Sequence, residues 1–282
     1  MSDSILAKYT RQPKIYTKLP SGGMFYEVNP FEKSSTGEIP VYSMTARDEM
    51  ILKTPDALMN GESIALNIKS CMPLIEDPYD VPIIDLDAII IALRIATYGE
   101  KMKLTVGVPN LENEELDYEI DLRVILDELM DRKWTNTFKY NDLVFHSKPL
   151  TLKDQNVIDL NTFETTRIVQ ALRVQDLSEE EKNKIVKDSF QRITDSNLNL
   201  VVKQIVAIET PEGTETNPTA IADFFNNTDS KVFGAVLDYL TEQKDNFSIP
   251  DRQVQVPKGL VEQGAPETIS TPLIFNQSNF FV

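Results

Sequence analysis

Residues able to do chemistry are few in this chain and lie far apart. His146 is its one histidine and Cys71 its one cysteine. A serine or cysteine nucleophile needs a base beside it, and neither a Gly-x-Ser-x-Gly turn nor a similar arrangement accompanies His146. We expect His146 to be an ordinary half-buried histidine in a strand and Cys71 to be a small core residue. These two residues are also too few to form a zinc site.

Carboxylate pairs are the other source of acid–base chemistry. Asp85 and Asp87 lie two residues apart at the expected start of a helix, where their side chains point to different faces. Capping of the helix and a favourable interaction with its dipole explain Asp85 without catalysis. Ser178 and Glu179–Glu181 form a capping-box pattern, and a solvated first helical turn explains them better than a metal site. The sequence therefore predicts no catalytic carboxylate pair.

Phosphate-binding loops are not found in the sequence either. Gly22-Gly23 has no Gly-x-x-x-x-Gly-Lys continuation, and Gly61 stands alone. We therefore expect no catalytic residue, no metal and no cofactor, and the sequence favours a protein that is not an enzyme.

The chain carries 28 basic and 44 acidic residues, a formal net charge of −16. That sign opposes binding to nucleic acid and to anionic membrane surfaces, which both depend on Lys and Arg. The longest apolar stretch, near Ile89–Ile91, is interrupted by Arg94 and is too short to cross a bilayer. The polar N-terminus has no signal-peptide pattern. We expect a soluble protein of a cytoplasm, without nucleic-acid, membrane or small-molecule partners.

The first half of the chain mixes short strands and helices. Aromatic and β-branched residues around Pro and Gly predict a hairpin over residues 14–28. Thr45 followed by Asp48 predicts a capping box that starts a helix, and a further helix is expected from Glu62 to Met72. The other expected elements are strands over residues 39–43, 101–108, 116–120 and 138–145, and a helix over 121–131.

The most apolar helix is predicted over Leu86–Tyr98, with Asp85 as its cap and Gly99 at its end. Its apolar residues leave little room for a solvent face, so we expect this helix at the centre of the N-terminal region. Arg94 lies inside it, and a buried guanidinium destabilises the fold unless it is paired. We expect a structural ion pair with a carboxylate such as Asp48, Glu49 or Asp85.

Helical patterning dominates after about residue 150. Helices are expected over residues 161–174, 178–193, 198–208 and 231–244, with another that starts at Asn217-Pro218. From Pro250 onward the chain is polar and punctuated by prolines, so it cannot build a core of its own. The sequence predicts an α+β fold with a mixed α/β N-terminal domain at 1–147, a helical domain at 148–248 and an extended C-terminal arm at 249–282.

The arm ends in apolar residues that need a surface to cover them. Our hypothesis is that Ile274, Phe275, Phe280 and Phe281 insert into pockets on a neighbouring subunit and bind that partner as hot spots. Deletion of residues 270–282 should then leave a folded protein that no longer enters its complex.

Two stretches of the N-terminal half carry a family pattern. The first is Leu19-Pro20-Ser21-Gly22-Gly23-Met24-Phe25-Tyr26, followed by Met44-Thr45-Ala46-Arg47-Asp48-Glu49-Met50-Ile51-Leu52, and the second runs from Asp85 through Leu93-Arg94-Ile95-Ala96-Thr97-Tyr98-Gly99. They resemble the T4-type phage baseplate hub assembly and tail-assembly family over about residues 17–100. Many relatives carry a Cys-Pro-x-Cys knuckle that suggests zinc. Here the corresponding place reads Val108-Pro109-Asn110-Leu111, so the resemblance comes without metal.

The resemblance implies a non-enzymatic baseplate hub subunit or hub assembly protein of a contractile-tailed phage. Its partners would be other phage baseplate or hub proteins, and it would reside in the tail baseplate of the virion after assembly in the host cytoplasm. Three alternatives stay open: a transient tail-assembly chaperone absent from the virion, a cell-wall-degrading hub enzyme, and an acidic adaptor of a bacterial complex.

Overall fold

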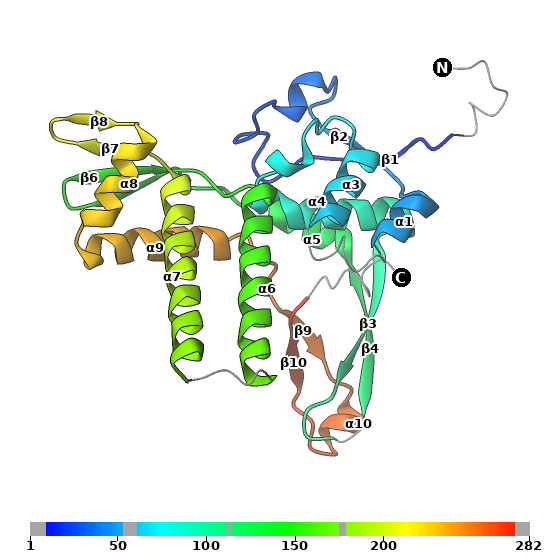
Figure 1. Cartoon of the computed structure of the whole chain (residues 1–282). Coiled ribbons are helices and arrows are strands. Elements are labelled where there is room, and N and C mark those ends of the chain that lie inside the picture. The colour runs from blue at the N-terminus through cyan, green and yellow to red at the C-terminus, as the bar shows by residue number, and fades with distance from the viewer. Residues whose placement is uncertain (1–9, 53–60, 112–113, 175–178, 274–282) are drawn as a thin grey trace.

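The computed structural model describes residues 10–52, 61–111, 114–174 and 179–273 (Figure 1). Helices and small antiparallel sheets occur together, which confirms the α+β fold class. Two large apolar clusters and a small one hold these elements together. The first cluster lies in the N-terminal body, the second packs a four-stranded sheet against its helices, and the third joins two β-hairpins that extend from the body.

In the N-terminal body, β1 (Pro13–Thr17) pairs antiparallel with β2 (Ile39–Tyr42). The hairpin predicted over residues 14–28 is therefore wrong in its second strand. The two glycines of the Leu19–Gly23 turn have φ of 62° and 83°, a conformation that glycine adopts without a steric penalty. The chain then passes through a 3-10 helix at Pro30–Lys33 before it returns as β2.

The helices of the body are α1 (Ala46–Leu52), α3 (Glu62–Cys71), α4 (Ile83–Tyr98) and α5 (Leu122–Met130), with a 3-10 helix at Pro78–Asp80. The capping box predicted at the start of α1 is confirmed. Thr45 donates its N–H and its hydroxyl to the Asp48 carboxylate at 2.7 and 2.8 Å, and the Asp48 N–H donates back to the Thr45 hydroxyl at 3.3 Å.

The helix α4 begins at Ile83, three residues before its predicted start, with Pro82 at the N-cap. Gly99 ends it with a φ of 94°, and its N–H donates to the carbonyl of Ile95 at 3.0 Å. From Ile84 to Ala96 nearly all its residues are buried, against β1, β2 and α5 among other elements. These contacts explain why α4 has no polar face of its own.

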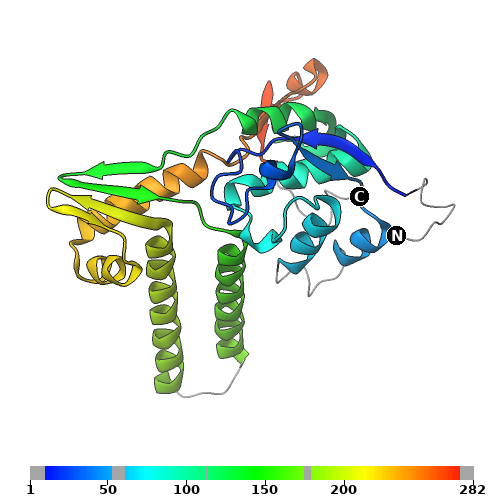
Figure 2. The same ribbon diagram turned by 90° about the horizontal axis from the view of Figure 1, so that it is seen from above.

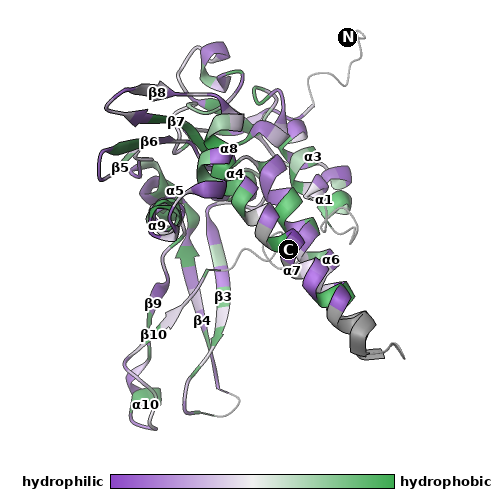
Figure 3. Ribbon diagram, turned by 60° about the vertical axis from the view of Figure 1, so that its left-hand side comes forward, coloured by the Kyte–Doolittle hydropathy of each residue, from purple (hydrophilic) through white to green (hydrophobic). Residues whose placement is uncertain are grey.

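The predicted strand pair after α4 is confirmed: β3 (Lys101–Gly107) and β4 (Glu115–Asp121) form an antiparallel hairpin. Near the C-terminal end of the described chain, β9 (Arg252–Gln255) pairs antiparallel with β10 (Thr268–Thr271). The short helix α10 (Lys258–Val261) lies between these two strands. The two hairpins extend from the body next to each other in Figures 1 and 3.

The third apolar cluster joins these two hairpins. Val108, which follows β3, is buried together with Val256, Ala265 and Ile269. A polar segment with few apolar residues thus becomes ordered by sharing a core with β3 and β4. Residues 252–271 of the predicted C-terminal arm form this hairpin, and the arm's apolar end lies outside the described residues: Ile274, Phe275, Phe280 and Phe281.

A four-stranded antiparallel sheet has the order β5-β6-β7-β8. Its strands are β5 (Thr137–Tyr140), β6 (Leu143–Ser147), β7 (Ile205–Thr210) and β8 (Gly213–Glu215). The helices α8 (Pro218–Asn227) and α9 (Ser230–Asp245) pack on it, and Phe145 and Val236 are fully buried between them. Asn217 caps α8 through its side chain, as Asn217-Pro218 predicts.

Two sequence predictions fail in this sheet. Residues 138–145 do not form one strand, because Asn141 adopts a positive φ of 53° and turns the chain back. The helix predicted over 198–208 ends at Gln204, and the apolar run from Ile205 becomes β7 because it pairs with β6. Strands from both sides of residue 147 therefore share one sheet.

Two long helices, α6 (Leu152–Val174) and α7 (Glu179–Gln204), lie between β6 and β7 in the sequence. They run antiparallel and project away from the sheet and the body (Figure 2). Lys203 pairs with Asp154 at 2.7 Å, and Asn161 donates to Ser196 at 3.0 Å. Over the described part of the chain, the helices are too short or too polar to span a membrane.

Candidate functional site

Asp85, predicted as a helix cap, is instead a buried acceptor inside the first turn of α4. The Ser21 N–H donates to it at 2.8 Å, the Ser21 hydroxyl at 2.6 Å and the Tyr26 hydroxyl at 2.9 Å. Burial raises the pKa of Asp85 to about 6, and the hydrogen bonds from Ser21 and Tyr26 oppose that rise. Burial, with Asp85 beside it, also raises the pKa of Tyr26. The Asp85 carboxylate therefore fastens the Leu19–Gly23 turn to α4.

Asp48 is a second buried carboxylate, with 5% of its surface exposed. Besides its capping contacts with Thr45, it accepts from the Ser70 hydroxyl at 3.0 Å and pairs with the Arg11 guanidinium at 3.5 Å. Arg11 also donates to the carbonyls of Ser43 and Ser70. Asp48 thus joins α1, α3 and the segment that leads into β1.

Arg94 is 7% exposed, and its guanidinium lies over the ring of Tyr98 at 4.6 Å from the centroid. Burial lowers the pKa of Arg94. Of the carboxylates predicted to pair with it, Asp85 is bound by Ser21 and Tyr26, and Asp48 by Arg11, Thr45 and Ser70. One contact of Arg94 is thus a cation–π interaction with Tyr98, which lies in the same helix.

The remaining chemically capable residues are far apart. Nε2 of His146, on β6, lies 2.9 Å from the Glu209 carboxylate on β7. Cys71 is fully buried at the end of α3, where burial raises the pKa of its thiol. Across the described ranges, no group of three His, Cys, Asp or Glu side chains has the geometry to hold a metal ion.

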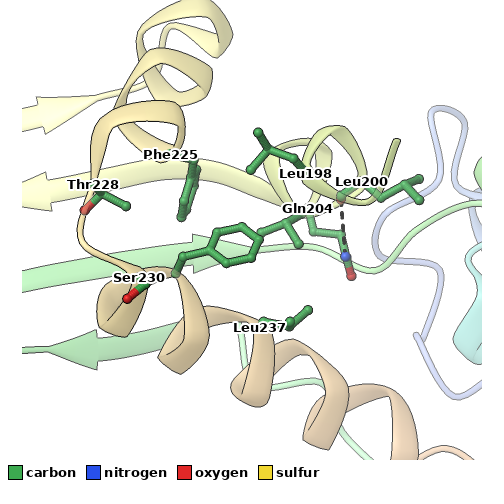
Figure 4. Close-up of a pocket in the computed structure, with 9 residues that line it drawn as sticks. Leu198, Leu200, Gln204, Phe225, Thr228, Ser230 and Leu237 are labelled. Carbon is green, nitrogen blue, oxygen red and sulfur yellow. Dashed lines mark hydrogen bonds between the residues drawn. The ribbon is translucent and has the colours of Figure 1, made fainter. Parts of the chain in front are cut away.

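An apolar pocket of about 700 Å³ opens where α7, α8 and α9 meet (Figure 4). It is lined by Leu198, Leu200, Val201, Gln204, Phe225, Thr228, Ser230, Phe233 and Leu237. None of these nine side chains is an acid, a base or a metal ligand. The Gln204 amide donates to the Leu200 carbonyl at 3.3 Å, and Leu237 is 42% exposed at the pocket. This pocket suits apolar side chains of a partner.

The sequence did not reveal this pocket. Its residues come from three helices and the turn before α9, so no local periodicity marks them together. The sequence predicts a helix over residues 231–244 but does not indicate which of its apolar residues stay exposed. The structure buries Val236 and Leu240 and leaves Leu237 exposed at the pocket.

A second pocket, of about 670 Å³, is lined by residues from the Leu19–Gly23 turn and by Arg132, Lys133 and Trp134 among others. The Arg132 guanidinium donates to the carbonyls of Asn246 and Ser248, so it joins the residues that follow α5 to those that follow α9. The Leu19–Gly23 turn thus forms part of the accessible surface as well as of the body.

The helix α6 carries a third exposed feature, which we call the α6 stripe: Val157, Leu160 and Phe163. These side chains are 43%, 39% and 39% exposed. Their spacing of three residues places them along one side of the helix. The Arg167 guanidinium lies 5.8 Å from the centroid of the Phe163 ring. Contiguous exposed apolar residues of this kind mark contact surfaces.

Comparison of the chain with protein-family models, with curated proteins and with solved structures gave no significant match. The chain's own residues provide three features that bear on its function: the buried carboxylates of the N-terminal body, the apolar pocket and the α6 stripe.

Proposed function

We propose that this chain is a non-enzymatic subunit or assembly protein of the baseplate hub of a contractile-tailed phage. It acts through contacts with other baseplate or hub proteins, in the virion tail or during assembly in the host cytoplasm. The observation that supports this best concerns the residues that carry the family resemblance. Ser21, Asp48 and Asp85 make the buried contacts of the N-terminal body.

Because the residues that carry the resemblance make these buried contacts, the resemblance concerns the fold of the N-terminal body. Ser21 and Asp85 fasten a turn to a helix, and Asp48 joins two helices, so neither group is free to bind a substrate. In this chain the surface offers the apolar pocket, the α6 stripe and two projecting hairpins.

The shape of the chain fits a connecting role. The helices α6 and α7 project in one direction and the β3–β4 and β9–β10 hairpins extend separately from the body (Figures 1 and 2). Projecting elements expose long surfaces to more than one neighbour, as a protein inside a multi-subunit assembly requires. Contact with a partner would stabilise these projecting elements.

Affinity purification of the tagged full-length chain from infected cells tests the proposal. Mass spectrometry should identify baseplate or hub proteins that are enriched over a purification with the tag alone. Recovery of the chain with no baseplate protein would contradict the proposal. So would release of soluble fragments from bacterial cell walls by the purified chain, since that result requires catalysis.

A permanent subunit and a transient chaperone differ in one observable. Mass spectrometry of purified virions should detect the chain in a fixed ratio to known tail proteins if it is a subunit. Its absence from virions, with baseplate proteins still bound to it in the cell, assigns it to assembly.

A further inference from the structure

A groove separates the two hairpins that extend from the body. It has a volume of about 560 Å³ and is lined by three consecutive residues of β4, Tyr118–Ile120, and by the chain from Asp251 to Gln255 on β9. Each hairpin is a separate two-stranded sheet, so β4 and β9 each have one strand neighbour in the described structure. The groove therefore lies between one strand of each hairpin, β4 and β9.

Along β4, the backbone N–H and C=O groups that are not bonded to β3 point away from it. The Leu122 N–H donates to the Glu100 carbonyl at 2.8 Å and the Val108 N–H to the Glu114 carbonyl at 2.9 Å. Hydrogen-bonded pairs alternate along an antiparallel ladder, so Tyr118 is bonded to β3 while Asp117 and Glu119 are not. The N–H and C=O groups of Asp117 and Glu119 therefore point to the outer edge of β4.

The edge of β9 has the same arrangement. The Val256 N–H donates to the Glu267 carbonyl at 3.0 Å, which fixes the alternation of bonded pairs along β9 and β10. It follows that Val254 is bonded to β10, whereas Gln253 and Gln255 turn their backbone groups outward. Both strands thus present unpaired donors and acceptors to a common groove, and such edges bind an added strand.

Charge indicates which strand would fit. On β4, the outward residues Asp117 and Glu119 are exposed and lie in a row with Glu115 and Asp121. Across from these four carboxylates β3 places only two lysines; Lys101 pairs with Glu119 at 2.8 Å, and Thr105 donates to Asp117. The row therefore carries two more negative charges than the lysines of β3 can balance. The opposite face of β4 is apolar: Leu116, Tyr118 and Ile120.

We propose that this groove receives an extended segment of a partner protein in which Lys or Arg alternates with apolar residues. The segment adds to β4 as a strand of about five residues, the length of chain that lines the β9 side. Its basic side chains lie beside the carboxylate row, and its apolar side chains lie beside Tyr118 and Ile120. A second copy of this acidic chain is disfavoured as the partner because like charges repel. The inference does not depend on the proposed function, since backbone groups and charges of this chain alone define the groove.

A synthetic peptide tests the inference directly. The probe is a capped seven-residue peptide in which Lys alternates with Val, titrated into the full-length protein and followed by amide NMR signals. Binding should shift the amide signals of Asp117, Glu119 and Gln253 and slow the hydrogen exchange of those amides. A matched peptide with Glu in place of Lys should not bind. No binding of the lysine peptide at up to about 1 mM would overturn the inference, as would equal binding of both peptides.

Two further comparisons separate strand addition from general attraction between charges. Two further peptides carry methyl groups on alternate backbone nitrogens, one on the odd and one on the even residues. Both keep the charge but lose hydrogen-bond donors, so at least one of them should lose binding. Undiminished binding of both would contradict strand addition. In the protein, Asp117→Asn with Glu119→Gln should weaken binding about five-fold. The matched control, Asp238→Asn with Glu242→Gln, removes the same charge from α9 and should change it less than about two-fold. Equal weakening by both pairs would overturn the assignment to β4.

Discussion

The hydroxyl and the backbone N–H of Ser21 both donate to the carboxylate of Asp85, at 2.6 and 2.8 Å, across 64 residues of sequence. This contact fastens the Leu19–Gly23 turn to α4. Asp85 is fully buried, so its hydrogen bonds are made away from water, where an unsatisfied partner is costly.

Asp85→Ala should lower the free energy of unfolding by about 2–4 kcal/mol, because the Ser21 N–H and hydroxyl and the Tyr26 hydroxyl lose their buried acceptor. Urea unfolding followed by circular dichroism measures the change. The control Asp238→Ala removes an exposed carboxylate from α9 and should stay within about 0.5 kcal/mol of the wild type. Equal effects of the two substitutions would refute the structural role of Asp85.

The stability that Asp85 confers should depend on pH. Burial raises its pKa from an ordinary 3.8 to about 6, so the folded state binds the proton more tightly than the unfolded state. This contribution is fully present below pH 3.8 and is lost as the pH rises through about 6. The Asp85→Asn variant has no carboxyl group to titrate at this position, so it serves as the reference. The unfolding free energy of the wild type minus that of the variant should fall by up to about 3 kcal/mol between pH 3.8 and about 6. A difference that stays constant with pH would show that Asp85 is ionised throughout.

Arg94→Met should lower the free energy of unfolding by about 1–2 kcal/mol, because the guanidinium over the Tyr98 ring is lost from a largely buried site. Thermal unfolding of the purified variant measures the change. A variant that keeps its full stability but loses its partners would show that Arg94 serves binding and not the fold.

Leu237→Lys should leave the fold intact and weaken the recovery of partners that use the apolar pocket. Leu237 is 42% exposed at the pocket, so lysine is accommodated in water but places a charge against apolar partner side chains. Val206→Lys is the matched control, since Val206 on β7 is 43% exposed and does not line the pocket. Quantitative affinity purification should show at least about a ten-fold loss for the first variant and little for the second. Equal recovery with both variants would exclude the pocket.

Deletion of residues 274–282 tests the arm. This boundary preserves β10, whereas deletion from residue 270 removes half of that strand and so disturbs the β9–β10 hairpin. The shorter chain should keep its unfolding midpoint and lose its place in the complex, because Ile274, Phe275, Phe280 and Phe281 are predicted to contact a partner. A lower midpoint would show that these residues pack on their own chain.

Local signals in the sequence predicted local structure well. The capping box of Thr45 and Asp48 involves residues three apart, and the β3–β4 hairpin joins neighbouring segments, so propensity and turn residues are sufficient to locate both. Pairing across distance was not predictable in the same way. The partner of β1 is β2 and not the nearer residues 24–28, because Ser21 is held by Asp85 and the chain leaves the turn in another direction.

The same difference between local structure and distant contacts is found in the candidate site. Asp85 and Asp48 were identified as structural residues from their position near helix starts. Two of their partners lie far away in the sequence and were not predicted: Ser21 donates to Asp85, and Arg11 pairs with Asp48. The run from Ile205 is apolar enough for a helix or a strand, and only its pairing with β6 decides between them. The groove between β4 and β9 depends on the direction of backbone groups, which composition does not encode.

Electron microscopy of particles made when the gene for this chain is silenced tests its proposed role in the baseplate hub. Without the chain, we expect tails that lack a complete baseplate, or no tails, and we expect the wild-type chain to restore full assembly. Normal numbers of complete, infectious particles without the chain would contradict a role in the baseplate hub.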